Sequence, residues 1–182
     1  MATKNWAIDP NHSEVQFKVK HLMISTVTGQ FKQFTGSIET NGEDFTTAKV
    51  NFTADISSIS TNNDQRDVHL NQGDFFDAAN HPQLIFTGDK LEKADGDDYK
   101  LYGSFTIKGI TKKVVLDAEF GGQTQDPWGN TRVGFSVTGK INRVDFGISF
   151  SMVSETGGIL LGEDIKINAN VQFVKQAVLQ PA

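Results

Sequence analysis

Apolar and polar residues alternate one by one along most of this chain. The clearest stretch is Ala48–Ile56, where every second residue is apolar and the residues between them are polar. A period of two places alternate side chains on opposite faces of a β-strand, so each such stretch predicts a half-buried strand. Strands are therefore predicted at residues 15–19, 30–40, 48–56, 83–91, 99–108, 113–120, 133–141 and 165–173.

The alternation of apolar and polar residues is interrupted near the N-terminus and between two phenylalanines. Residues 6–13 read as an irregular start, with a turn at Asp9-Pro10-Asn11. Between Phe31 and Phe34 the apolar spacing slips by one residue, which predicts a β-bulge inside the strand 30–40. A Ser/Gly-rich loop is expected through Gly157-Gly158, and the tail 176–182 is expected to fray.

One long segment does not alternate. Thr61 or Asn62 can cap a short helix that runs to about Leu70, and Phe75 and Phe76 follow between two aspartates. Apolar rings flanked by acids suit a segment that is half inside the core, so at least one of the two rings should be buried. We expect residues 61–80 to form a helical plug that closes the β-structure.

Eight half-buried strands with antiparallel-style connections and no internal repeat indicate an all-β fold of one domain, residues 1–182. Closing eight strands into an antiparallel barrel removes the exposed sheet edges and leaves room for side chains or one small ligand. A sandwich of two sheets would leave edges that need protection. The barrel is therefore the preferred interpretation.

The interior should be apolar and partly open. The chain has 14 Phe against 2 Tyr and 2 Trp, and phenylalanine has no polar group that needs a partner. Gly36, Gly103 and Gly139 stand on otherwise apolar strand faces, where a missing side chain suggests a cavity. The alternative is a fully packed core in which the phenylalanines simply fill the space.

The charge limits the class of partner. A formal net charge of −5 and a pI near 5.3 argue against nucleic acid and anionic membrane surfaces. The chain has no cysteine, so disulfides and thiolate metal sites are excluded. No secretory leader is recognisable at the start, so a cytoplasmic location is expected for the chain as given, and a periplasmic one if a leader was removed.

Two clusters of polar residues could carry chemistry. His12, His21, His69 and His81 lack the spacing of a zinc motif, so neither a metal nor another cofactor is expected. Arg66, Asp67, His69, Asp74 and Asp77 could act as acid, base and anion partner, or they could pin the plug through caps and ion pairs. No nucleophile with an adjacent base is recognisable, so a structural role for this cluster is preferred. A small β-barrel enzyme that acts on a hydrophobic substrate through Arg66, His69, Asp74 and Asp77 is the alternative.

Several segments, taken in order, resemble the YceI-like family. They are DPNHSEVQFKVKH at 9–21, RDVHL at 66–70, DFFD at 74–77, HPQLIF at 81–86, GSFTIKG at 103–109, TKKVVL at 111–116 and RVDFG at 143–147. The resemblance covers almost the whole chain. It implies a lipocalin-like antiparallel barrel that binds, sequesters or transports a polyisoprenoid or other long-chain amphiphile, such as an isoprenoid quinone or a polyprenyl phosphate, without catalysis.

The predicted site follows from the alternation and from this resemblance. The lipid tail is expected to contact Phe17, Val19, Phe52, Phe86, Phe105, Val114, Leu116, Phe120, Val133, Phe135, Ile167, Ala169 and Val171, and Ile165 is expected on the same inward face. Its head group is expected near His12, His69 or Arg143. The partner is one long-chain isoprenoid or fatty lipid, and a homodimer is left open. The direction in which the Arg66 cluster points should separate binding from catalysis.

Overall fold

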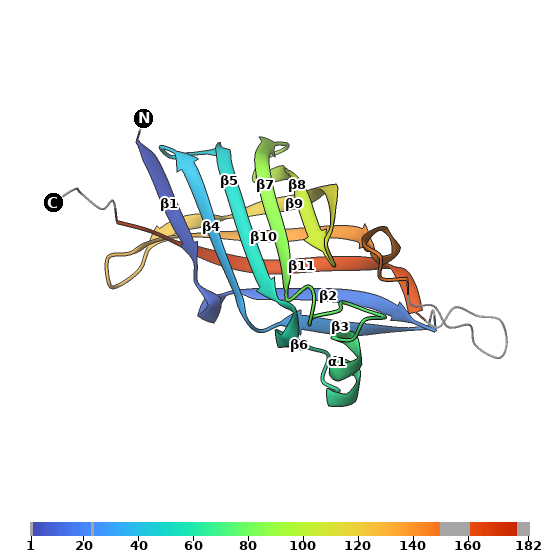
Figure 1. Ribbon diagram of the computed structural model, residues 1–182. Helices are drawn as coiled ribbons and strands as arrows, with labels where there is room; N and C mark the ends of the chain where they lie inside the picture. The colour runs from blue at the N-terminus through green and yellow to red at the C-terminus, as the bar shows by residue number, and fades with distance from the viewer. Residues whose placement is uncertain (1, 23, 150–160, 178–182) are drawn as a thin grey trace.

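The computed structural model describes residues 2–22, 24–149 and 161–177, and these form one antiparallel sheet that closes into a barrel (Figure 1). The strands are β1 (Thr3–Ile8), β2 (Glu14–His21), β3 (Ser25–Phe31), β4 (Phe34–Asn41), β5 (Asp44–Asp55), β6 (Ile59–Ser60), β7 (Gln83–Lys93), β8 (Asp98–Ile107), β9 (Ile110–Gln125), β10 (Thr131–Asn142) and β11 (Leu161–Lys175). The helix α1 spans Asp64–Leu70, and short 3-10 helices are η1 (Pro10–His12), η2 (Ile56–Ser58) and η3 (Arg143–Phe146). Within the described residues, no helix has the length and apolar character needed to span a lipid bilayer.

Eight of the strands form the closed ring, as predicted. Their order is β1-β4-β5-β7-β8-β9-β10-β11, and β11 pairs back onto β1. The remaining strands β2, β3 and β6 continue the sheet from the same edge of β11. Ile8 of β1 pairs with Phe173 of β11, and Glu14 of β2 pairs with Asn170, so β1 and β2 lie end to end along one partner strand. The barrel is therefore longer than a single ring of short strands.

The start of the chain differs from the prediction. Residues 6–8 are not irregular: they belong to β1, where Trp6 is 1% exposed and Ile8 is buried. The strand was missed because its inward alternation is short and stops at Asp9-Pro10. Pro10 then begins η1, whose N-cap Asp9 accepts a hydrogen bond from the Asn11 amide at 3.0 Å. This turn redirects the chain from β1 into β2.

The predicted bulge is a complete break. β3 ends at Phe31 and β4 begins at Phe34, and both rings are buried. The two residues between them make their backbone bonds with the turn around η2: the Lys32 amide donates to Ser58 O, and the Asp55 amide donates to Gln33 O. Two strands thus replace the predicted strand 30–40, because the same chain must pair with β2 and then with β5.

The predicted helix is confirmed with a shifted cap. Asn63, rather than Thr61 or Asn62, is the N-cap, and its side chain accepts from the Arg66 amide at 3.0 Å. Phe75 is buried in the core and Phe76 is partly buried against it, which confirms that at least one of the two rings is inside. Of the predicted frayed tail, Gln176 is hydrogen bonded through its amide to Asn5 O at 2.7 Å. Residues 178–182 and the loop at 157–158 lie outside the described residues.

Candidate ligand cavity

A cavity of about 510 Å³ lies inside the barrel. On β11 alone it is bordered by Leu161, Ile165, Ile167, Ala169, Val171 and Phe173. These residues span nearly the whole strand, which corresponds to about 40 Å of strand length at a rise of about 3.3 Å per residue. The volume is typical of small-molecule sites, about 300–1,000 Å³. A space of this volume spread along a whole strand is long and narrow.

One end of the cavity is filled by aromatic rings. Phe45 lies 5.4 Å from Trp6, 5.5 Å from Phe135 and 6.1 Å from Phe120, measured between ring centroids. Phe45 stands at the start of β5, beside the hairpin from β4. Edge-to-face and tilted contacts of this kind contribute to packing beyond the area they bury. His21 and Arg143 lie near the opposite end of β11: His21 pairs with Leu161, and Arg143 donates to the Leu161 carbonyl.

Most of the predicted tail residues border the cavity. The lining includes Phe17, Val19, Phe52, Phe86, Phe105, Leu116, Phe135, Ile167, Ala169 and Val171, together with Ile165 and the predicted head-group residues His69 and Arg143. Val114, Phe120 and Val133 do not border it: Val133 is part of the core cluster, and the other two pack against that cluster. Contact between the lining residues and a ligand stays a prediction.

His12 is not at the cavity. It is an exposed residue of η1, and its Nδ1 lies 2.7 Å from the Asp9 carboxylate. His12 precedes β2, and the turn at Pro10 leaves it exposed and away from the cavity lining, so a contact between His12 and a head group is not supported by its position. His21, four residues beyond Phe17, does border the cavity. It continues the alternation of Val15, Phe17 and Val19, so the sequence pattern could have identified it.

The glycines do not open the cavity. A Cβ atom at Gly139 would overlap the side chain of Leu116, one at Gly103 would overlap Thr87 O and crowd Phe86, and one at Gly36 would touch Ile8 at 3.4 Å. Each missing side chain therefore makes room for a neighbour on the next strand. The argument from glycine to cavity was wrong, although a cavity exists. An eight-stranded ring is itself wide enough to leave one.

The helical plug is held by its own polar residues. Arg66 donates from Nε to Thr61 Oγ1 at 2.8 Å and from Nη2 to Thr61 O at 2.6 Å. The Asp67 carboxylate accepts from the same threonine, from its amide at 2.9 Å and its hydroxyl at 2.6 Å. Lys108 reaches the plug from the β8–β9 turn and donates to Gly73 O at 2.8 Å. These contacts fix α1 against the end of the barrel.

The cluster that the sequence suggested is divided between the wall and the surface. Arg66 and His69 border the cavity, whereas Asp74 and Asp77 do not. His69 Nε2 lies 2.6 Å from the Asp74 carboxylate, and this hydrogen bond is the main cause of a lowered pKa at Asp74. Asp77 accepts from Asn80 Nδ2 at 3.0 Å. The four residues therefore do not converge on one point of the cavity. Catalysis would require such convergence, whereas holding the plug in place does not.

Arg143 is a buried cation in the cavity wall. The residue is 4% exposed, and its guanidinium donates to Ile148 O at 2.7 Å, Gly162 O at 2.8 Å and Leu161 O at 3.2 Å. Burial lowers the pKa of Arg143 from its usual value, and the negative charge of Glu163 opposes this. Among the described residues no carboxylate forms an ion pair with it.

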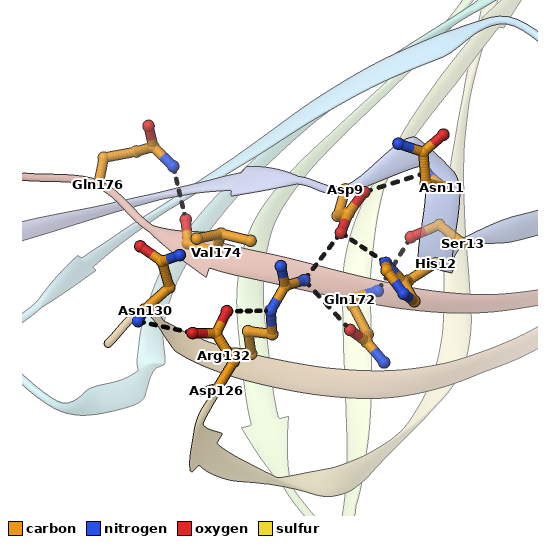
Figure 2. A network of polar contacts seen from close by, with 10 residues as sticks. All are labelled: Asp9, Asn11, His12, Ser13, Asp126, Asn130, Arg132, Gln172, Val174 and Gln176. Carbon is orange, nitrogen blue, oxygen red and sulfur yellow. Dashed lines mark hydrogen bonds and ion pairs between the residues drawn. The ribbon is translucent and has the colours of Figure 1, made fainter. Parts of the chain in front are cut away.

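A second polar network lies outside the cavity (Figure 2). Arg132 lies between Asp9 and Asp126, with nitrogen–oxygen distances of 2.8 Å to each carboxylate. The hydrogen bonds from Arg132 and then from His12 lower the pKa of Asp9 to about 2. This network joins η1 to the loop before β10, so its role is to hold the closure of the barrel.

Comparison with known proteins places the chain. The model of the YceI-like domain matches residues 6–173. The UPF0312 protein SAB2563 of Staphylococcus aureus (strain bovine RF122 / ET3-1) is 42% identical over 170 residues, which cover 93% of this chain and 96% of the relative. Two solved structures share the fold. BcnA of Burkholderia cenocepacia has a TM-score of 0.79 at 21% identity over 91% of this chain and 98% of that one. A polyisoprenoid binding domain from Saccharophagus degradans has a TM-score of 0.73 at 14% identity over 94% and 98%. By the domain match and the close relative, this chain belongs to the YceI-like family.

Proposed function

We propose that this protein binds one long-chain lipid of the polyisoprenoid type inside its barrel and sequesters or carries it, without chemical change. The observation that supports this most is the shape and lining of the cavity, which is long, narrow and almost wholly apolar. A compact ligand such as a fused-ring molecule would leave most of such a space empty, whereas one extended chain would occupy it. The Saccharophagus degradans domain of the same fold, described as polyisoprenoid binding, agrees with this ligand class.

The apolar wall can supply the affinity. Each buried CH₂ group contributes about 0.8 kcal/mol, so about fifteen buried carbons give a gross gain of roughly 12 kcal/mol. Association and ordering of a flexible tail offset several kcal/mol of this gain. When this cost is about 4 kcal/mol, a remainder of about 8 kcal/mol is left, which corresponds to a Kd of about 1 μM. Polar contacts are then needed for orientation and selectivity more than for affinity.

Binding explains the placement of the polar residues better than catalysis. Asp74 and Asp77, the acids that a reaction on the bound substrate would use, are outside the cavity wall. His69 is engaged with Asp74, and Arg66 with Thr61. If the protein were instead an enzyme, a polyisoprenoid substrate incubated with it would be converted, and His69→Ala would abolish the conversion.

The direct test is native mass spectrometry of the purified full-length chain, combined with organic extraction. We expect a species one lipid heavier than the chain, or uptake of one geranylgeraniol or solanesol per chain from a detergent-free suspension. The same sample denatured in acid and solvent should release that mass into the organic phase. A chain that carries no lipid and takes up neither alcohol would contradict the proposal.

A further inference from the structure

We propose that the head group of the bound lipid is an oxyanion, a phosphate or a carboxylate, and that Arg143 binds it inside the barrel. This inference rests on the proposed function and adds the chemical class of the head group. It is carried by two independent observations: the sign of the charges that border the cavity, and the burial of Arg143 with only carbonyl partners among the described residues.

The charges around the cavity are opposite to those of the whole chain. The chain has 22 acidic against 17 basic residues. Yet the polar residues that border the cavity, within the described part of the chain, are Gln16, His21, Thr61, Arg66, His69 and Arg143. No aspartate or glutamate is among them. A wall with hydrogen-bond donors and cations but no carboxylate favours an anion over a cation or a polyol.

Arg143 is the buried cation of this wall, and no carboxylate of the described residues forms an ion pair with it. A guanidinium group carries five N–H donors, and three hydrogen bonds to backbone carbonyls occupy only part of them. Carbonyl oxygens accept these bonds but do not neutralise the charge. A buried cation without an anionic partner is costly, and a charge-assisted hydrogen bond is about twice as strong as a neutral one. A phosphate or carboxylate oxygen would accept hydrogen bonds from the remaining N–H groups of Arg143 and would also neutralise the charge of the guanidinium.

The other basic residues of the wall have different surroundings. Arg66 is exposed and holds Thr61 through two hydrogen bonds, and His69 is paired with Asp74. His21 is different: it pairs in register with Leu161, whose carbonyl accepts from Arg143 Nη2. His21 and Arg143 therefore share Leu161 as a neighbour and both border the cavity, so His21 is placed to supply a further N–H to an anion there.

The position of Arg143 suits a head group. It begins η3 at the end of β10, and its carbonyl partners Leu161 and Gly162 open β11. Phe135 and Phe173, at the other end of the β10–β11 pair, border the aromatic end of the cavity. A lipid with its anion at Arg143 would thus extend its tail along β11 toward Phe45. The simpler alternative is that Arg143 only ties the carbonyls of Ile148 and Leu161, and this alternative predicts no preference for anions.

The test compares two ligands that share one tail, geranylgeranyl phosphate and geranylgeraniol, by titration into the full-length chain after lipid extraction. The unaltered chain should bind the phosphate at least about tenfold more tightly than the alcohol, because hydrogen bonds to charged groups are worth the most. Arg143→Met should reduce this ratio to near one and leave the affinity for the alcohol within about threefold. Arg143→Lys should keep part of the preference. Lys166→Met, which removes the same charge from the outer face of β11, should keep all of it.

Several outcomes would overturn the inference. Equal affinities for the two ligands in the unaltered chain would do so, and this result needs no variant that could fail to fold. An unchanged ratio in a folded Arg143→Met protein, or loss of the ratio in Arg66→Met instead, would also do so. Inorganic phosphate that displaces geranylgeranyl phosphate at equal concentration would show an ion site independent of the lipid. If the unaltered chain binds neither ligand, the proposed function itself fails.

Discussion

Arg132 bonds to Asp9 across 123 positions of sequence, with Nη1 and Oδ2 separated by 2.8 Å. The pair joins the turn between β1 and β2 to the first residues of β10, and Arg132 also holds Asp126 at 2.8 Å. Since β1 and β2 both pair with β11, this contact lies where the ring closes. It is a structural contact, outside the cavity, and its contribution can be measured as a dependence of stability on pH.

The first prediction is that stability carried by Asp9 is lost in acid. Its pKa in the folded chain is about 2, below the ordinary value of 3.8, so the contribution is complete above pH 4 to 5 and falls as pH drops toward 2. Its size is about 1–2 kcal/mol, allowing for partial exposure. Asp9→Asn keeps an acceptor for the turn and removes the charge. Urea unfolding should show a gap between the two proteins that is largest near pH 7 and falls to about a third of that size at pH 2.5. Glu14→Gln, an exposed carboxylate on β2, should show little gap at any pH, and a pH-independent gap for Asp9→Asn would refute the assignment.

The second prediction concerns the anchor of the plug. Phe75 is 7% exposed, lies edge-on to His69 at 4.9 Å between centroids, and borders the cavity. Phe75→Ala should lower the free energy of unfolding by about 3–5 kcal/mol. Val68→Ala, on the outer face of α1 at 62% exposure, is the control and should change it by less than about 0.5 kcal/mol. Equal effects from the two substitutions would show that the plug is not seated through its aromatic ring.

The third prediction is that a side chain added inside the cavity blocks the lipid. Ala169 is half-buried and borders the cavity midway along β11, so Ala169→Phe fills space that is open in the fold. We expect lipid uptake to fall by at least about tenfold, with unfolding midpoints close to those of the original chain, since no packed neighbour has to move. Lys166→Phe adds the same ring to the outer face of the strand and should leave uptake unchanged. Normal uptake by a folded Ala169→Phe protein would show that the lipid binds elsewhere.

The fourth prediction tests whether Gly139 makes room for the side chain of Leu116 rather than for a ligand. Because Leu116 covers this glycine, Gly139→Ala should destabilise the fold by about 1–3 kcal/mol through overpacking. Leu116→Ala alone should cost about 2–5 kcal/mol through lost contacts. In the double variant the new methyl group has room. The loss of unfolding free energy in the double variant should therefore be smaller than the sum of the two single losses, by a coupling energy of about 0.5–3 kcal/mol. Additive costs in denaturant unfolding would mean that the two positions do not touch.

The alternation of residue types was enough to predict most of the wall. Where a strand is long, as from 165 to 173, the period of two leaves only one way to bury the apolar face, and the residues of β11 follow it into the cavity. The same alternation, continued from Val19, would also have predicted His21 as a residue of the cavity wall. The helical plug and its buried aromatic pair could also be predicted, because a capped helix and two rings between acids have local causes. Thr61, by contrast, is a wall residue held by Arg66 and Asp67 rather than a cap, which depends on how α1 folds back.

Long-range pairing decided the rest. The sequence by itself determined most of the strands, the apolar interior, the plug and the net negative charge, since these follow from the period and composition of neighbouring residues. Only the tertiary structure decided that β1 and β2 share one edge of β11, that Leu116 covers Gly139, and that His12 lies outside the barrel. It also decided that Arg143 is a buried cation with only carbonyl partners among the described residues. Each of these depends on which distant backbone comes to lie beside a residue, and a one-dimensional pattern does not contain that distance.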